Sequence, residues 1–186
     1  MSDTFDFEAF PKIARWNREV IVTEKIDGTN AQVVISDDGL IVRAGSRNRF
    51  ITPQDDNHGF ARWVVEHHDE LLTLGPGRHF GEWWGSGIQR GYGLAKGEKR
   101  FSLFNVSRWC ETRPPCCHVV PVLWRGIVER LDVPAQLLGL RGLGSSASPG
   151  FMQPEGIVIF HVAGGHFFKA TLGDDGHKGE ARNVQP

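Results

Sequence analysis

Short β-branched or apolar runs separated by tight-turn residues fill the first part of the chain, and this alternation restricts the fold more than any other feature. The runs cover residues 20–24, 31–36 and 40–44, and Asp-Gly steps lie between them at residues 27–28 and 38–39. Asp-Gly favours tight reversals because glycine accepts a positive φ without steric cost. The pattern therefore predicts antiparallel strands in a meander.

Helices are fewer than strands in the rest of the sequence. Residues 59–74 carry apolar side chains at helical spacing, and Gly-Pro-Gly at residues 75–77 ends that run. Further strands are predicted at residues 79–83, 101–106, 156–162 and 166–170, with a helical stretch over residues 125–140. The connections between most of these strands are too short for repeated crossover helices. We therefore predict an α+β fold of antiparallel β-sheets flanked by helices.

Composition excludes several classes of protein. A chain of 186 residues can bury a core without disulfides, and we expect residues 1–186 to form one domain. No apolar run approaches the ~18 residues of a membrane-spanning helix. Three cysteines, Cys110, Cys116 and Cys117, fit a reducing compartment, so we expect a cytoplasmic protein, and their spacing assigns them no further role. The net charge of −1 means that any contact with nucleic acid must come from a local patch.

Lys25 lies two residues before Asp27-Gly28, where a predicted strand ends. A lysine amine acts as a nucleophile only in its neutral form, which burial or neighbouring cations favour. A Lys-x-Asp-Gly match also arises by accident, and then the lysine is an exposed turn residue. The segment alone leaves both interpretations open.

Six short segments of the chain match, in order, the motifs of one enzyme superfamily. They lie at residues 24–30, 46–48, 80–83, 102–106, 154–159 and 167–170. In this order they resemble motifs I, Ia, III, IIIa, IV and V of the covalent nucleotidyltransferases, which include polynucleotide ligases and mRNA capping enzymes. The chain is most similar to the RNA ligase branch of the nick-sealing RNA ligase 2 type. The resemblance implies the ATP-grasp-like adenylyltransferase domain of these enzymes.

The resemblance also implies roles for nine residues. Lys25 would attack the α-phosphorus of ATP and carry AMP. Asp27, Glu82 and Glu155 would place carboxylates around a hydrated Mg²⁺ or Mn²⁺, since such hard cations prefer oxygen ligands. The residues implied to bind ATP or AMP are Glu24, Asn30, Arg47, Phe104 and Lys169. Phe104 would stack on the adenine, although a phenylalanine in an apolar strand is more often part of a core.

The chain departs from the family pattern at three points. Motif V commonly has two lysines separated by one residue, whereas the next lysine after Lys169 is Lys178. Asn105 stands where many relatives have an aspartate. The chain ends at Pro186, so we expect no C-terminal accessory domain, with self-adenylylation intact and strand sealing poor.

Together these observations predict an ATP-dependent RNA ligase, suited to RNA repair, that acts through lysyl-AMP. The expected partner is nicked or duplex RNA with 5′-phosphate and 3′-hydroxyl ends, and a protein partner is a candidate substitute for the accessory domain. Two alternatives stay open. The same chemistry serves an adenylyltransferase or DNA ligase with a different acceptor, and a non-catalytic module would bind only nucleotide or RNA.

Overall fold

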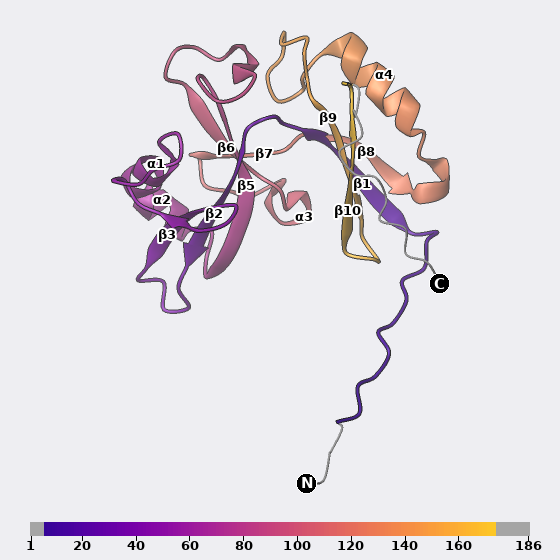
Figure 1. Ribbon diagram of the computed structural model, residues 1–186, viewed down its shortest axis with the longest axis horizontal. Helices are drawn as coiled ribbons and strands as arrows, with labels where there is room; N and C mark the ends of the chain where they lie inside the picture. Colours follow the sequence, from indigo (N-terminus) through magenta and orange to yellow (C-terminus); the bar gives the residue numbers. More distant parts are fainter. Residues whose placement is uncertain (1–5, 174–186) are drawn as a thin grey trace.

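Two β-sheets form the frame of the computed structural model, which describes residues 6–173 (Figure 1). The four-stranded sheet contains β1 (Glu19–Lys25), β8 (Val122–Ile127), β9 (Gly156–His161) and β10 (His166–Thr171), in the order β10-β9-β1-β8. The six-stranded sheet contains β2 (Thr29–Ile35), β3 (Val42–Ser46), β4 (Phe50–Ile51), β5 (Gly77–Gly85), β6 (Lys99–Leu103) and β7 (Cys117–Val119), in the order β4-β3-β2-β5-β6-β7. Neighbouring strands are antiparallel except β6 and β7, which are parallel.

β1 and β2 belong to different sheets, although only three residues separate them. Residues 26–28 cross from the end of β1 to the start of β2, so the reversal predicted at residues 27–28 is wrong. Glycine is required at position 28 for another reason, because a Cβ there would lie 2.5 Å from the carbonyl oxygen of Trp83. The reversal predicted at residues 38–39 is confirmed, since β2 pairs with β3 and Gly39 has a φ of +71°.

Helices connect strands of both sheets. They are α1 (Phe60–Glu66), α2 (His68–Leu72), α3 (Val106–Trp109) and α4 (Val133–Leu143), with 3₁₀ turns η1 (Gly91–Gly93) and η2 (Val128–Arg130). The helix predicted over residues 59–74 divides at His67 into α1 and α2. The helix predicted over residues 125–140 is corrected at its start, because Asp132 caps α4 by accepting a hydrogen bond from the Ala135 N–H at 2.9 Å. Residues 125–127 belong to β8.

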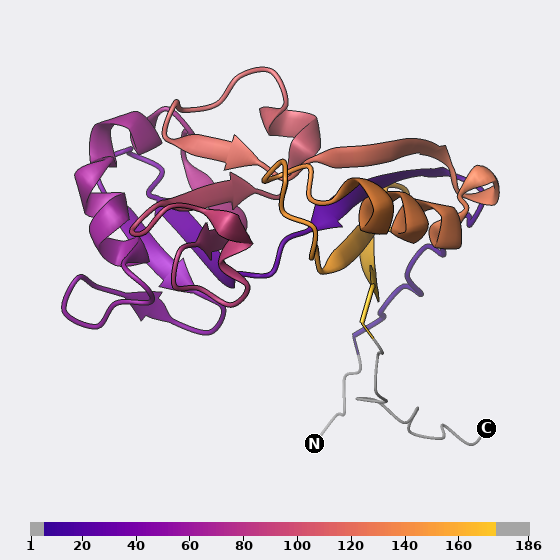
Figure 2. The ribbon, with the colours of Figure 1, turned by 90° about the horizontal axis from the view of Figure 1, so that it is seen from above.

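Three apolar clusters hold these layers together. One, including Val33, Phe60 and Phe101, fills the space between the six-stranded sheet and α1 and α2. A second, around Trp84 and Tyr92, joins the facing sides of the two sheets, and a third lies beneath α4. Figure 2 shows the two sheets from above, with α1 and α2 at one end and α4 at the other. The α+β fold is confirmed, and no helix within residues 6–173 is both long and apolar enough to cross a membrane.

Candidate active site

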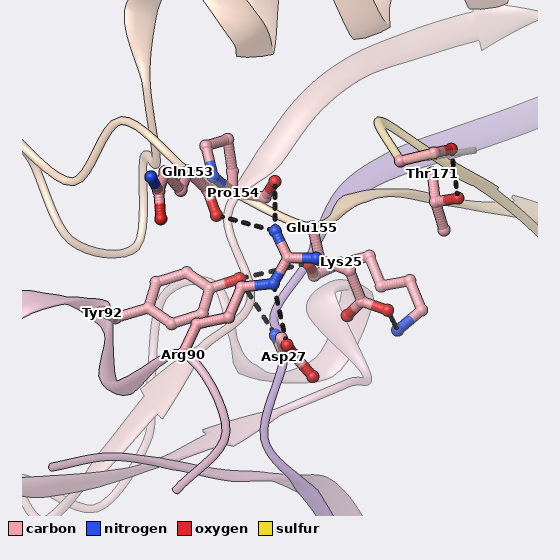
Figure 3. Close-up of polar contacts among 9 residues, drawn as sticks. Lys25, Asp27, Arg90, Tyr92, Gln153, Pro154, Glu155 and Thr171 are labelled. Atoms are coloured by element: carbon pink, nitrogen blue, oxygen red, sulfur yellow. Dashed lines mark hydrogen bonds and ion pairs between the residues drawn. The ribbon is translucent and has the colours of Figure 1, made fainter. Parts of the chain in front are cut away.

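Lys25 ends β1 at the crossing between the sheets, beside the first residue of β9. Its Nζ lies 2.5 Å from Glu155 Oε1, and the two side chains are 24% and 18% exposed (Figure 3). Lys25 faces Gly156 across the β1–β9 pair. A Cβ on Gly156 would lie 2.2 Å from the carbonyl oxygen of Ala170, so only glycine lets β10 approach this closely. The strand pairing thus places Glu155 beside the lysine.

The second carboxylate oxygen of Glu155 is unusual. Oε2 is buried and has no hydrogen-bond partner among residues 6–173. Nearly all buried polar atoms have a partner, because desolvation without one costs roughly 1–3 kcal/mol. Glu155 Oε2 is therefore a candidate to bind a ligand or a cation.

Glu82 adds a second carboxylate to Lys25 and Glu155. It lies on β5 directly opposite Asn30 of β2. Burial raises the pKa of Glu82 to about 7 against the opposing influence of the Lys25 ammonium and the Gly28 N–H, while the charge of Glu155 raises it further. A carboxyl group with a pKa near neutrality gains from a bound cation, which stabilises its charged form. Lys25, Glu82 and Glu155 thus form one electrostatic group.

Asp27 does not join this group. Its Oδ2 accepts a hydrogen bond from Arg90 Nε at 2.9 Å, and Arg90 Nη1 also donates to the carbonyl oxygens of Gln153 and Pro154 at 3.0 and 3.2 Å. Within the described part of the chain, no three His, Cys, Asp or Glu side chains lie close enough to hold a metal ion. The structure therefore does not bring the three predicted carboxylates together. Glu82 and Glu155 alone fit Mg²⁺, which usually keeps several waters and uses one or two carboxylates.

Three of the residues predicted to bind ATP or AMP lie around the lysine and its carboxylates. Asn30 pairs with Glu82 across the sheet, and Arg47, in the turn after β3, acts electrostatically on Glu82. Lys169 of β10 lies on the same face of its sheet as Lys25, as the strand register requires. Phe104 follows β6 and packs half-buried on the cluster between the sheets. Lys178 lies outside the described residues.

Glu24 points to the other face of β1 and is almost completely buried. Its carboxylate accepts hydrogen bonds from Ser145 Oγ at 2.6 Å and from the N–H groups of Ser146 and Ala147 at 2.8 and 2.9 Å. All three donors belong to the loop after α4. The structure thus separates Glu24 from Lys25 and engages its carboxylate within the fold.

Two residues near Lys25 were missed by sequence reasoning, namely Arg90 and Tyr92. Tyr92 Oη accepts a hydrogen bond from the Asp27 N–H at 2.9 Å and donates to the carbonyl oxygen of Lys25 at 3.4 Å (Figure 3). Burial raises the pKa of Tyr92, so its hydroxyl remains a donor. Tyr92 has a φ of +52°, a strained backbone for a bulky residue. One feature of the sequence could have identified Tyr92: it is the chain's single tyrosine and lies in the glycine-rich segment 85–93.

Comparisons with known proteins point to one family. The family model described as RNA ligase matches residues 18–171, which include every candidate residue named above except Lys178. Mutant forms of a Naegleria gruberi RNA ligase have similar structures. One, solved with ATP and Mn, has a TM-score of 0.60 and 23% identity over 83% of this chain and 50% of that chain. Another, solved with AMP and Mn, has a TM-score of 0.62 and 22% identity over 84% and 50%.

The present chain spans about half the length of these matched structures. At such identities the likeness shows the fold alone, and that fold confirms the adenylyltransferase architecture predicted from the sequence. No curated protein sequence gives a significant match to the chain.

Proposed function

Because this chain belongs to the RNA ligase family, we propose that it is an ATP-dependent ligase that joins RNA ends through a lysyl-AMP intermediate. One observation carries the proposal. Lys25 lies where β1 crosses to the second sheet, 2.5 Å from Glu155, whose other oxygen is buried without a partner among residues 6–173. An amine beside a carboxylate oxygen that has no hydrogen-bond partner is suited to attack a phosphate that binds together with a metal cation.

In the first step, Lys25 Nζ loses a proton and attacks the α-phosphorus of ATP. The new N–P bond forms as the bond to pyrophosphate breaks, and the lysine then carries AMP. Glu155 Oε1 lies within reach of the departing proton. Arg47 and Lys169 would bind phosphate oxygens, Asn30 would hydrogen-bond to the nucleotide, and Phe104 would stack on its adenine.

Glu82 and Glu155 are the residues that would hold Mg²⁺ or Mn²⁺, and such an ion, when bound, favours the neutral amine and offsets negative charge on the phosphates. Asp27 has a positioning role in this proposal, because Arg90 ties it to residues 153–154, just before Glu155. Glu24 likewise anchors the end of β1 through its carboxylate.

Two further transfers complete the proposed reaction. AMP passes from Lys25 to a 5′-phosphate, and a 3′-hydroxyl then attacks that phosphate and releases AMP. The substrate would be nicked or duplex RNA, and residues 1–186 would act as one nucleotidyltransferase domain in a reducing cytoplasm. Free Cys110, Cys116 and Cys117 are compatible with that compartment.

A labelling experiment tests the first step. Incubation with ATP and Mg²⁺ should add the mass of AMP to the peptide that contains Lys25, and EDTA should prevent the addition. Lys25→Ala should eliminate the adduct, whereas Lys12→Ala, a change at an exposed lysine, should retain it. An adduct on another lysine would refute the assignment.

A sealing experiment tests the acceptor. We expect slow sealing of a 5′-phosphorylated nick, faster sealing of a pre-adenylated nick at low salt, and a preference for an RNA 3′-hydroxyl strand, since the 2′-hydroxyl offers a contact that DNA lacks. Efficient sealing of all-DNA nicks at physiological salt would exclude RNA specificity. Labelled Lys25 without sealing of any pre-adenylated RNA nick would instead favour an adenylyltransferase with another acceptor.

A further inference from the structure

The six-stranded sheet has one face covered by α1 and α2 and another that the second sheet covers only in part. Along β5 this second face carries Trp84, Glu82, Phe80 and Arg78 at alternate positions. Trp84 is 1% exposed, Glu82 is half-buried, Phe80 is 47% exposed and Arg78 is exposed. Contact with the other sheet therefore ends near Glu82, and the face beyond it meets solvent.

Strand register organises the open part of this face into two rows. In the first, Gln32 pairs with both Gly45 and Phe80, and Gly45 pairs with Phe50, so we name Phe50, Gly45, Gln32 and Phe80 the aromatic row. In the second, Val34 pairs with both Arg43 and Arg78, and we name Arg43, Val34 and Arg78 the basic row. Asn30 and Glu82 of the candidate active site form the next pair on the same face of β2 and β5, about 7 Å from the aromatic row.

The aromatic row presents two rings at the surface. Phe50 and Phe80 are 45% and 47% exposed, so both rings are accessible to a ligand. Between them Gly45 has no side chain, and a Cβ there would lie 2.7 Å from the Gln32 side chain. Gln32 is fixed by donating to the carbonyl oxygen of Ser46 and accepting from Arg78 Nη1. Between the two rings, therefore, no bulky side chain projects from the sheet, and the Gln32 side chain is held in place.

The basic row supplies charge without acidic partners. Within residues 6–173, no salt bridge involves Arg43 or Arg78. Arg43 instead lies over the Phe50 ring at 5.4 Å, and Arg78 donates to Gln32. Both guanidinium groups thus keep donors for an anion, and arginine binds phosphate oxygens in a two-pronged geometry.

We propose that this face binds nucleotides that lie unpaired next to the joining site of a nicked or duplex RNA whose end reaches Lys25, with bases stacked on Phe50 and Phe80 and phosphates bound by Arg43 and Arg78. The assignment rests on the proposed function and extends it to the position of the strand. Aromatic rings with flanking arginines on an open sheet face are the features by which proteins hold single-stranded nucleic acid. The rows continue the face that carries Glu82, and their positive charge complements a polyanion.

Binding measurements can separate stacking from charge. The probes are a fluorescein-labelled twelve-nucleotide RNA and an abasic strand of the same length, titrated at low salt in EDTA without ATP. Phe80→Ala and Phe50→Ala should each weaken binding of the RNA by about tenfold and leave binding of the abasic strand within twofold of wild type. Phe80→Trp should restore RNA binding. Arg78→Gln and Arg43→Gln should weaken both probes and reduce the salt slope by about 0.7 each.

Matched controls lie on the other sheet and on the far side of the molecule. Phe168→Ala removes a phenylalanine that is 51% exposed on the face of β10 opposite to that of Lys25, and Arg130→Gln removes an exposed arginine. Both should bind RNA as the wild type does. Thermal unfolding of each variant shows whether it is folded.

Several results would overturn the proposal. The first is wild-type affinity for RNA in both phenylalanine variants. The second is a loss of affinity in these variants that is equally large for the abasic strand or for a blunt RNA duplex. The third is a sedimentation coefficient that differs between these variants and the wild type, which would show that the face mediates self-association. Lysine labelling of the wild type with ATP is measured in parallel. Labelling without RNA binding rejects the RNA surface and retains the proposed first step, whereas the expected RNA pattern without labelling rejects the proposed ligase and retains the surface.

Discussion

Two glutamates lie next to Lys25, Glu24 before it in β1 and Glu155 across the β1–β9 pair, and their carboxylates meet opposite surroundings. The loop after α4 surrounds Glu24 with a hydroxyl and two backbone N–H donors. Glu155 has only the Lys25 ammonium on one oxygen, and its other oxygen has no partner in the described chain. A fully bonded carboxylate contributes to the fold, whereas an underused buried carboxylate suits ligand chemistry.

The largest expected effect is on catalysis at Glu155. Glu155→Gln keeps the shape of the side chain and removes its charge, so the rate of Lys25 adenylylation should fall about 10²- to 10³-fold. The free energy of unfolding should change by less than about 1 kcal/mol, because Lys25 is partly exposed and can be hydrated. Single-turnover labelling and urea unfolding measure the two quantities. A labelling rate close to that of the wild type would remove Glu155 from the mechanism.

The opposite outcome is expected at Glu24. Glu24→Gln turns an amide NH₂ toward donors that need an acceptor, so the free energy of unfolding should fall by about 3 kcal/mol. Urea unfolding at pH 8 measures the loss, and Ser145→Ala, which removes one donor, should cost less. If Glu24→Gln were as stable as the wild type, the contrast between the two glutamates would fail.

A comparable effect, spread over more than two pH units, is expected in the pH dependence of stability, through Glu82. Its pKa is raised from 4.5 to about 7 on folding, so the folded protein binds a proton more tightly than the unfolded chain between those values. In EDTA the stabilisation should be complete below pH 4.5 and disappear as the pH rises through about 7, a loss of up to about 3 kcal/mol. Urea unfolding across this range measures it.

Two variants sharpen that measurement. Glu82→Gln should flatten the pH dependence between pH 4.5 and 7, and Glu155→Gln should reduce its slope because a repelling charge is gone. An unchanged slope in Glu82→Gln would mean that another group titrates.

The smallest expected effect is at Tyr92, which anchors the segment between Lys25 and Asp27. Tyr92→Phe removes the acceptor of the Asp27 N–H and should lower the free energy of unfolding by about 1 kcal/mol. The adenylylation rate should fall severalfold. Added Mg²⁺ should restore neither the free energy of unfolding nor the rate. Stability and rate equal to those of the wild type would show that the bond does not position Lys25.

Much of the fold could be predicted because its signals are local. The strands expected at residues 20–24, 79–83 and 156–162 correspond to β1, β5 and β9, since β-branched and apolar runs between turn residues are properties of a few neighbouring positions. Gly28 and Gly156 were likewise found as motif residues. Their physical reasons, close approach to Trp83 and to Ala170, depend on strands distant in the sequence.

The candidate site was predictable in its membership and less so in its arrangement. Six ordered motifs were enough to name Lys25, Glu82 and Glu155, which the structure brings together. They also named Asp27 as a metal ligand, whereas the structure pairs it with Arg90, 63 residues later in the chain. A motif records the type of residue at each position, but it does not record which side chains elsewhere compete for its atoms.

Local sequence was thus sufficient for the strands, the α+β class and the chemically important residue types, because propensity, turn chemistry and motif spacing act over short stretches. Long-range packing was required to place β1 and β2 in different sheets and to distinguish the two glutamates. Ser145, which bonds to Glu24, lies 121 residues away in the chain. Whether every oxygen of a buried carboxylate has a hydrogen-bond donor depends on groups that only the folded chain brings near. Tertiary contacts therefore decide that the Glu24 carboxylate is fully bonded while one oxygen of Glu155 has no partner in the described chain.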